Sequence, residues 1–204
     1  MERQSVVFMV DDDDAVRDGI ELLVKSVGLE FRGFSSAQGF LDRCGPSERG
    51  CLVLDVRMPG MGGLALQEEL AKLNYSLPVI VLTGHGNVKM GIQAMKAGAF
   101  DFIEKPPHEQ VLLDTVQKAI RKDSEAKICE LEQKAMCDKL AHLTHRGREI
   151  LGFIIEGKVN KQIAAELELS EKTIEFHRSK LMKQLGVDSL HGLIRFALST
   201  GLYE

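Results

Sequence analysis

The sequence predicts two domains of different fold class, a doubly wound α/β domain followed by a smaller, entirely helical domain. Within residues 5–105, short apolar runs alternate with amphipathic helical patterns, which is typical of a parallel sheet with helices on both faces. Beyond Pro106 and Pro107, apolar residues recur only at helical spacing. A chain of 204 residues, 44% of them apolar, is long enough to bury two modest hydrophobic cores.

Five strands and four intervening helices are expected in the first domain. Its strand-like runs cover residues 6–10, 30–34, 51–54, 77–82 and 100–103, and the helical patterns between them cover residues 15–27, 36–44, 63–73 and 87–97. The third and fourth strands are almost wholly apolar, as expected for strands that are covered on both faces. In such a sheet the functional crevice lies beyond the carboxyl ends of the strands.

A long helix is predicted to join the two domains. Residues 108–140 contain neither Gly nor Pro, and residues 121–143 carry five charges of each sign. The apolar positions form only a narrow stripe: Ile120, Ile128, Leu131 and Ala135. We therefore expect the second half of this helix to be solvated and to act as a semi-rigid spacer. A two-stranded coiled coil is an alternative, although the apolar repeat covers too few heptads to favour it.

Four helices are expected in the second domain, over residues 145–156, 160–168, 171–185 and 189–200. Residues suited to cap their N-termini are Thr144, Asn160, Ser170 and either Asp188 or Ser189. The short connection between the second and third helices is that of a helix-turn-helix. The predicted domain limits are 1–120, 121–140 for the helical linker, and 141–204.

Charge is divided unevenly between the two parts of the chain. Residues 1–120 hold 12 Lys and Arg against 17 Asp and Glu, a net charge of −5, whereas residues 121–204 hold 14 against 13, a net charge of +1. The helix predicted at 171–185 carries four cations and two acids. Only the second domain is therefore expected to meet a polyanion such as nucleic acid.

Polar side chains follow the predicted strands at the points where those strands end. Asp11 and Asp12 follow the first strand, Asp55 the third, Thr83 the fourth and Lys105 the fifth. Because the carboxyl ends of parallel strands share one edge of a sheet, these side chains should converge. Clustered carboxylates need a cation, and this set suits Mg²⁺ and a phosphoryl group. The central carboxylate, Asp55, is the expected nucleophile. Taken alone, an Asp run after a strand is more simply a helix start.

Four segments of the first domain resemble the receiver domain of two-component response regulators: VVFMVDDDDAVR, LVLDVRMPGMGG, PVIVLTGHG and AGAFDFIEKP. The resemblance covers roughly residues 4–120 and implies a flavodoxin-like fold. It implies that Asp55 is the phospho-acceptor. It also implies that Mg²⁺ is bound by Asp12, Asp55 and the backbone carbonyl of Arg57, with Asp11 acting through a water molecule.

The same resemblance implies a conformational switch. Thr83 and Lys105 would contact the phosphoryl oxygens, and Thr83 would turn inward, so that Phe102 at the switch aromatic position could follow. The Lys105–Pro106 peptide bond is expected to be cis, as in the family. Remodelling of the face formed by residues 87–105 would then promote homodimerisation.

Three segments of the second domain resemble the LuxR/FixJ-type DNA-binding domain: LTHRGREIL, GKVNKQIAAELELSEKTIEFHRSKLMKQL and SLHGLIRFAL. The chain as a whole is similar to the FixJ branch of response regulators. By this resemblance, three residues of the recognition helix face DNA bases: Glu175, Phe176 and Ser179. Six residues would lie near the DNA backbone: Lys161, Lys172, Thr173, His177, Arg178 and Lys183.

The predicted function is that of a bacterial response regulator and not an enzyme. It would accept a phosphoryl group from a sensor histidine kinase, bind double-stranded DNA and regulate transcription, as an activator with RNA polymerase as a partner. One alternative is a regulator that works without phosphorylation. Another is an aspartyl-phosphate hydrolase of the haloacid dehalogenase type, which is disfavoured because Arg57 occupies the position of its second Asp and no cap domain is present.

The cysteines and the short apolar runs predict the cellular compartment of the protein. The four cysteines have no metal-binding spacing and are expected to be small, buried or half-buried apolar residues in a reducing compartment. The apolar runs are far shorter than a membrane span needs, and the N-terminus has no signal-peptide pattern. A cytoplasmic protein without a membrane partner is expected.

Overall fold

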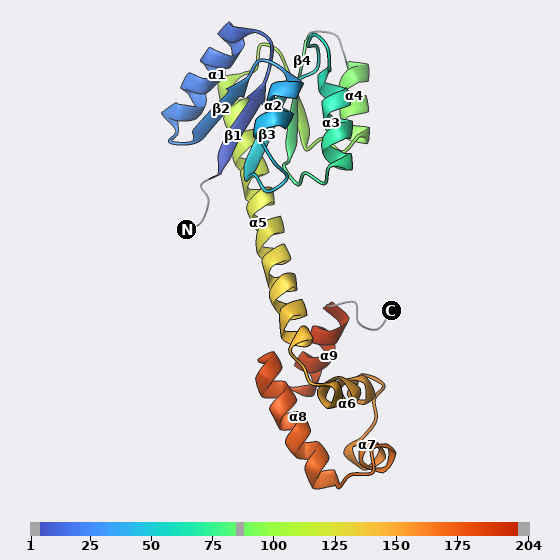
Figure 1. Ribbon diagram of the computed structural model, residues 1–204. Coiled ribbons are helices and arrows are strands. Elements are labelled where there is room, and N and C mark those ends of the chain that lie inside the picture. Colours follow the sequence, from blue (N-terminus) through green and yellow to red (C-terminus); the bar gives the residue numbers. More distant parts are fainter. Residues whose placement is uncertain (1–4, 85–87, 200–204) are drawn as a thin grey trace. The chain divides into compact units, whose positions relative to one another are not determined.

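The computed structural model describes residues 5–84 and 88–199 (Figure 1). The chain divides into two compact units, Met1–Lys127 and Ile128–Glu204. All of the described strands belong to the first unit, and the described part of the second unit is helical. The predicted pair of fold classes is confirmed. Residue 87 of the fourth predicted helix and residue 200 of the last lie outside the described residues.

The first unit is built on a parallel sheet of five strands in the order β2-β1-β3-β4-β5. The strands are β1 (Val6–Val10), β2 (Glu30–Phe34), β3 (Gly50–Asp55), β4 (Val79–Thr83) and β5 (Asp101–Glu104). From β1 the chain first adds β2 on one side and then crosses to add β3 on the other. The strand order therefore reverses between β1 and β3, and a crevice is expected at their carboxyl ends.

Helices cover both faces of the sheet and separate two apolar clusters. Successive residues of β1 point to opposite faces. Phe8 packs in a cluster with Phe40 of α2 (Ala37–Arg43), and also with residues of α3 (Gly63–Lys72) and α4 (Val88–Lys96). Met9 packs in the other cluster with Val24 of α1 (Asp14–Ser26) and Leu112 of α5 (Glu109–Ala141). Strands β3 and β4 are buried along their whole length, as their apolar sequences predicted.

The start of β3 requires a glycine. Gly50 has a φ of +124°, and a Cβ at this position would lie 1.9 Å from the carbonyl oxygen of Val6 in the neighbouring strand. A residue with a side chain could not approach β1 so closely. The backbone N–H of Gly50 donates to a carboxylate oxygen of Asp123, at 3.0 Å.

Helix α5 is a single long helix, as predicted, but its contacts with the sheet extend further than the charge pattern suggested. The side chain of Asp123, expected in the solvated linker, is buried and accepts a hydrogen bond from Arg49 Nε at 2.9 Å. The expectation that the charged half of the helix is exposed is wrong at this residue, because a sequence pattern cannot reveal a partner 74 positions away. Further along, Ile128 and Leu131 are exposed as expected.

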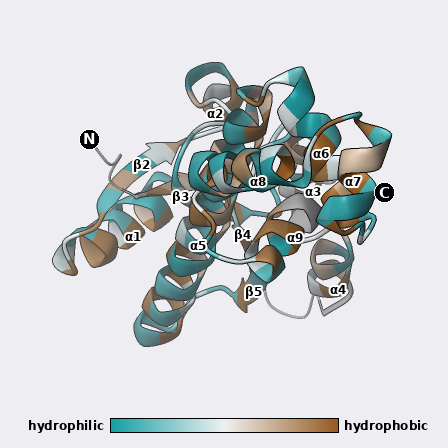
Figure 2. Ribbon diagram, turned by 90° about the horizontal axis from the view of Figure 1, so that it is seen from below, coloured by the Kyte–Doolittle hydropathy of each residue, from teal (hydrophilic) through white to brown (hydrophobic). Residues whose placement is uncertain are grey.

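The second unit contains the four predicted helices, which are α6 (His145–Ile155), α7 (Asn160–Glu166), α8 (Glu171–Leu185) and α9 (Leu190–Ser199). Their apolar faces meet in one cluster that includes Ile150, Ile154, Ile163, Ile174 and Leu181. Most residues of α8 are hydrophilic (Figure 2), and the helix buries Ile174, Leu181 and Leu185. This core holds α7 and α8 together as a helix-turn-helix.

Three of the predicted helix caps are formed. The side-chain oxygens of Thr144, Ser170 and Ser189 each accept a hydrogen bond from a backbone N–H three residues later. The prediction of Asn160 as a cap is wrong. The cap position of α7 is Val159, whose backbone N–H donates to Gln162 Oε1 at 3.0 Å, so Asn160 becomes the first residue of the helix.

The cysteines divide between the two units. Cys44 and Cys51 are buried in the first unit, as expected, whereas Cys129 and Cys137 are exposed. The prediction of buried cysteines fails for the second pair because both lie on the solvated half of α5. Across residues 5–84 and 88–199, we find no helix with the length and apolar character that crossing a membrane requires.

Candidate phosphoryl-transfer and DNA-binding sites

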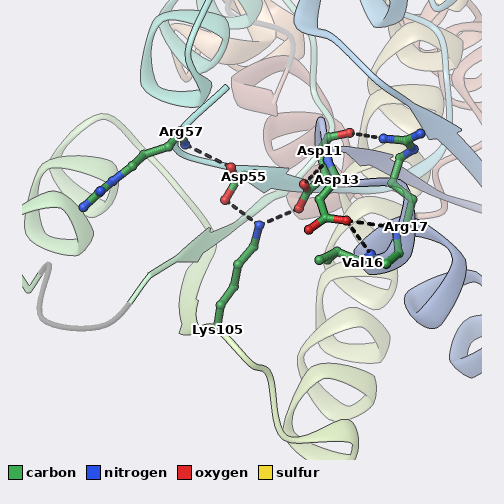
Figure 3. Close-up of polar contacts among 8 residues, drawn as sticks. Asp11, Asp13, Val16, Arg17, Asp55, Arg57 and Lys105 are labelled. Atoms are coloured by element: carbon green, nitrogen blue, oxygen red, sulfur yellow. Dashed lines mark hydrogen bonds and ion pairs between the residues drawn. The ribbon is translucent and has the colours of Figure 1, made fainter. Parts of the chain in front are cut away.

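The acidic pocket lies at the carboxyl ends of β1, β3 and β5. Asp11 follows β1, Asp55 is the last residue of β3, and Lys105 follows β5. The ammonium Nζ of Lys105 lies 2.6 Å from Asp11 Oδ2 and 2.7 Å from Asp55 Oδ1 (Figure 3). Both carboxylates are almost fully buried, with exposed fractions of 1% and 6%. The Lys105–Pro106 peptide bond is cis, as the resemblance implied.

A third carboxylate completes an oxygen-rich group. Carboxylate oxygens of Asp11, Asp12 and Asp55 all lie within 4.8 Å of one another, and Asp12 is the exposed member of the three. A set of carboxylate oxygens that is open to water on one side fits a hard divalent cation, which prefers oxygen ligands and retains several waters. The pocket is therefore compatible with divalent metal binding.

Burial and pairing set the electrostatics of Asp55. Burial raises the pKa of its carboxyl above the ordinary value, while the hydrogen bond and charge of Lys105 act in the opposite direction. Asp55 Oδ2 also accepts the backbone N–H of Arg57 at 3.1 Å. For Lys105, burial lowers the pKa, but its hydrogen bonds to Asp11 and Asp55 outweigh that effect and raise the pKa. Lys105 is thus held as a cation between two carboxylates.

Thr83 and Phe102, the two residues of the expected switch, lie on neighbouring strands. Thr83 ends β4 and is buried, and its hydroxyl donates to the carbonyl oxygen of Gly84 at 3.3 Å. Phe102 lies on β5 and its side chain is 37% exposed. In this structure the aromatic ring is therefore turned outward, with part of its surface in water.

Arg17 and Asp13 support the pocket, and the sequence did not single them out. Arg17 Nη1 donates to the backbone carbonyl of Asp11 at 2.6 Å, and the guanidinium also pairs with Asp14. Asp13 caps α1 by accepting the N–H of Ala15 at 2.9 Å, and its own N–H donates to Asp11 Oδ1 at 3.0 Å. The Asp run thus serves both as a helix start and as part of the pocket. The spacing of Arg17 from Asp13 and Asp14, one helical turn, is the signal that could have indicated it.

The residues expected at DNA lie on the exposed side of the helix-turn-helix. Lys161, Lys172, Glu175, Phe176, Ser179 and Lys183 are exposed, while Thr173, His177 and Arg178 are half-buried. Phe176 is 65% exposed, and its ring lies 6.0 Å from the His177 ring in an edge-to-face contact. An open hollow of about 640 Å³ is lined by Glu175, Ser179 and Lys183, among other residues.

Arg178 also has a contact within the second unit. Its Nη1 donates to Asn160 Oδ1 at 2.7 Å, which ties α8 to the start of α7. Asn160 was expected to cap its own helix, but its side-chain oxygen instead accepts a bond from the recognition helix. Sequence reasoning missed this pairing because the two residues lie 18 positions apart on different helices.

Comparison with known proteins identifies the family. Residues 7–117 match the response regulator receiver domain, and residues 141–197 match the family of bacterial regulatory proteins called luxR. The response regulator protein TmoT of Ectopseudomonas mendocina is 42% identical over 199 residues, covering 95% of this chain and 88% of the relative. The chain is a response regulator.

Two further relatives agree over nearly the whole length of this response regulator. The transcriptional regulatory protein FixJ of Azorhizobium caulinodans is 39% identical over 196 residues, covering 96% of this chain and 93% of FixJ. A low-resolution structure of the response regulator StyR has a TM-score of 0.86 and 40% identity, covering 96% of this chain and 98% of StyR. The predicted family is confirmed. Its receiver domain implies a histidine kinase as partner, and its LuxR-type domain implies DNA binding.

Proposed function

We propose that this response regulator accepts a phosphoryl group on Asp55 from a sensor histidine kinase and then acts on transcription as a DNA-bound homodimer. The observation that carries the proposal is the position of Lys105. Its ammonium pairs with Asp55 and Asp11 at once, beside the third carboxylate of Asp12. A buried nucleophile with a fixed cation beside it is what phosphoryl transfer requires.

In the proposed reaction, a carboxylate oxygen of Asp55 attacks phosphorus. A new O–P bond forms while the bond from phosphorus to the kinase histidine nitrogen breaks, and its electron pair leaves with that nitrogen. Lys105 would pair with one phosphoryl oxygen, and the Thr83 hydroxyl would donate to another. These two contacts would offset the negative charge that the acyl phosphate brings into the pocket.

Mg²⁺ is the proposed cation of the site. Asp12, Asp55 and the backbone carbonyl of Arg57 would bind it directly, and Asp11 would act through a water molecule. Bound Mg²⁺ supplies charge neutralisation between the carboxylates and the phosphoryl oxygens. The support is the set of three carboxylates within 4.8 Å of one another.

Phosphorylation is proposed to act through Thr83 and Phe102. The Thr83 hydroxyl would turn toward the phosphoryl group, and the aromatic ring would move into the space that it leaves. The face formed by residues 87–105 would change, favouring dimerisation; residue 87 lies outside the described residues. The proposed limits of the parts remain 1–120, 121–140 and 141–204, supported by family matches that end at residue 117 and resume at 141.

On DNA, the proposed base contacts are made by Glu175, Phe176 and Ser179 of α8. A Glu carboxylate can accept from cytosine N4, and a Phe ring can touch a thymine methyl. The proposed backbone contacts are Lys161, Lys172, Thr173, His177, Arg178 and Lys183. As an activator, the protein would also contact RNA polymerase. Replacing Glu175 with Ala should change the consensus of a binding-site selection, and an unchanged consensus would remove Glu175 from the base contacts.

Phosphorylation with acetyl phosphate and Mg²⁺ tests the proposal directly. Mass spectrometry should locate the modification on Asp55, and Asp55→Asn should abolish it because the amide keeps the shape but is not a nucleophile. Asp18→Asn, at an exposed position on α1, is the matched control and should be modified as the wild type is. Chelation of the metal should prevent modification. A label on another residue of the wild type would overturn the assignment.

Operator titration and sedimentation, each with and without beryllofluoride as a phosphoryl mimic, test the regulation. If the coupling free energy is of the size usual in allosteric proteins, operator binding should be about 5–150-fold tighter with beryllofluoride. The protein should also dimerise with beryllofluoride. Thr83→Ala should lose most of that gain while still accepting phosphate. Equal affinity and equal oligomeric state in both conditions would instead favour the regulator that works without phosphorylation.

A further inference from the structure

The ring of Phe102 rests on a position of α4 that has no side chain. Gly91 is buried, and a Cβ built on it would lie 2.9 Å from Cδ2, 3.0 Å from Cε2 and 3.2 Å from Cγ of Phe102. Carbon atoms in ordinary contact are about 3.5–4.0 Å apart. The outward position of the ring therefore uses space that any side chain at residue 91 would occupy.

Helix stability does not account for a glycine at this place. Glycine is the poorest helix former after proline, and Gly91 lies inside α4. The φ of Gly91 is not positive, so its backbone conformation does not require a glycine either. The three atoms nearest to the missing Cβ all belong to the Phe102 ring. The ring is thus the nearest group that the methyl of an alanine here would meet.

The ring is close in the sheet to the residue that would report phosphorylation. Phe102 lies two residues before Glu104, and Glu104 is the strand partner of Thr83 in the β4–β5 pairing. A movement of the Thr83 hydroxyl toward the pocket would open space on the β5 side of that residue. The Phe102 ring could then occupy either of two positions, the outward one against Gly91 or the inward one beside Thr83.

We propose that Gly91 is a positioning residue of the switch. Because it has no side chain, it leaves the space that the Phe102 ring occupies in its outward, resting position. The inference rests on the proposed function, in which Phe102 moves inward after phosphorylation. A methyl group at residue 91 would make the outward position less favourable and leave the inward position unchanged. Because coupling between states is reciprocal, it would also strengthen binding of the phosphoryl mimic.

The first test compares two alanine variants of the full-length protein. Gly91→Ala fills the space that the Phe102 ring occupies. Gly19→Ala, in the interior of α1, is the matched control because a Cβ there meets nothing within 4 Å. Both changes favour their own helix to the same extent, so a difference between them reports the ring. In excess Mg²⁺, Gly91→Ala should bind beryllofluoride about three- to tenfold more tightly than the wild type, and Gly19→Ala should not.

Removing the ring separates a switch role from a general effect on α4. In a Phe102→Ala background, adding Gly91→Ala should leave beryllofluoride affinity unchanged, because no ring is present to displace. A gain that persists without the ring overturns the inference. The inference is also overturned if Gly91→Ala binds beryllofluoride no more tightly than Gly19→Ala does. That result would mean that the ring moves into solvent and not toward Thr83.

A measurement on the unmodified protein covers the case in which Gly91→Ala fails to fold. Nuclear Overhauser contacts between the Gly91 α-protons and the Phe102 ring should be present in the resting protein and lost with beryllofluoride. If these contacts persist while beryllofluoride binds and operator affinity rises, the inference is overturned. If the wild type does not bind beryllofluoride at Asp55, the proposed function itself fails and the inference falls with it.

Discussion

The two units of this response regulator keep their functional charges in opposite surroundings. In the described residues, all six buried polar or charged side chains belong to the first unit: Asp11, Asp55, Gln67, Thr83, Thr115 and Asp123. The second unit buries an apolar cluster and leaves the charged residues of α8 largely at its surface. The first unit buries several polar side chains, most of them with partners, whereas the second presents its charged side chains to solvent.

The difference follows from what each site has to do. Phosphoryl transfer depends on charges that are already in place and partly shielded from water, because electrostatic interactions are stronger there and need no reorganisation. DNA recognition depends on side chains that can reach phosphates and base edges from an exposed helix. Buried charges require partners from distant parts of the chain, and exposed ones do not.

The largest expected contrast between the units is in cysteine reactivity. Burial, with a smaller effect of Asp123, raises the pKa of Cys51 to about 12. At pH 8 the Cys51 thiol would therefore be almost wholly protonated, and it is also shielded from reagents. Iodoacetamide at pH 8 should modify Cys129 and Cys137 quickly and leave Cys44 and Cys51 unmodified. Peptide mapping measures this, with all four reacting in guanidinium; early modification of Cys51 would contradict the buried placement.

Next in size is the effect of removing the buried carboxylate of α5. Asp123→Ala would leave Arg49 and the Gly50 N–H without their acceptor, and breaking a buried ion pair costs about 3–5 kcal/mol. Chemical denaturation should show this loss in the unfolding free energy of the first unit alone. Asp114→Ala, an exposed position on the same helix, is the control and should change it by less than about 0.5 kcal/mol. A loss below about 1 kcal/mol for Asp123→Ala would contradict the role of this anchor.

A smaller effect is expected for single exposed lysines of the recognition helix. Lys172→Ala and Lys183→Ala should each lower the slope of log affinity against log salt by about 0.9, if each side chain neutralises one phosphate. Affinity should fall alike on all DNA sequences. Lys134→Ala, exposed on α5, is the control and should leave the slope unchanged. Unchanged slopes for both recognition-helix variants would place those lysines away from the DNA backbone.

The smallest effect is expected at a buried amide. Gln67 Nε2 donates to the carbonyl of Ala94 at 3.1 Å, but its Oε1 has no hydrogen-bond partner. Gln67→Met keeps most of the volume, loses one hydrogen bond and removes the unpaired oxygen, so the unfolding free energy should change by less than about 1 kcal/mol. Gln67→Ala, which leaves a cavity, should cost about 2 kcal/mol or more. Thermal and chemical unfolding of both variants measure the difference, and equal losses would contradict this reading of the oxygen.

Much of the fold and part of the candidate site could be predicted from the sequence. Apolar residues spaced by two or by three to four positions indicated the strands and helices, because each element has to bury one face or both. The convergence of Asp11, Asp55 and Lys105 followed from the same pattern, since the carboxyl ends of parallel strands meet at one edge. The DNA contacts of α8 came instead from the resemblance to the LuxR/FixJ-type domain, and they stay a prediction.

Only the tertiary structure decided which distant residues become partners. Arg49 holds Asp123, Asn160 holds Arg178, and the Phe102 ring lies against Gly91. The local pattern predicted a solvated charge at Asp123 and a helix cap at Asn160, and it gave no expectation for Gly91. The physical reason is that periodicity encodes the face that an element buries, but not the element that covers that face. Partners of buried polar groups, and space left by a missing side chain, arise only when the elements pack.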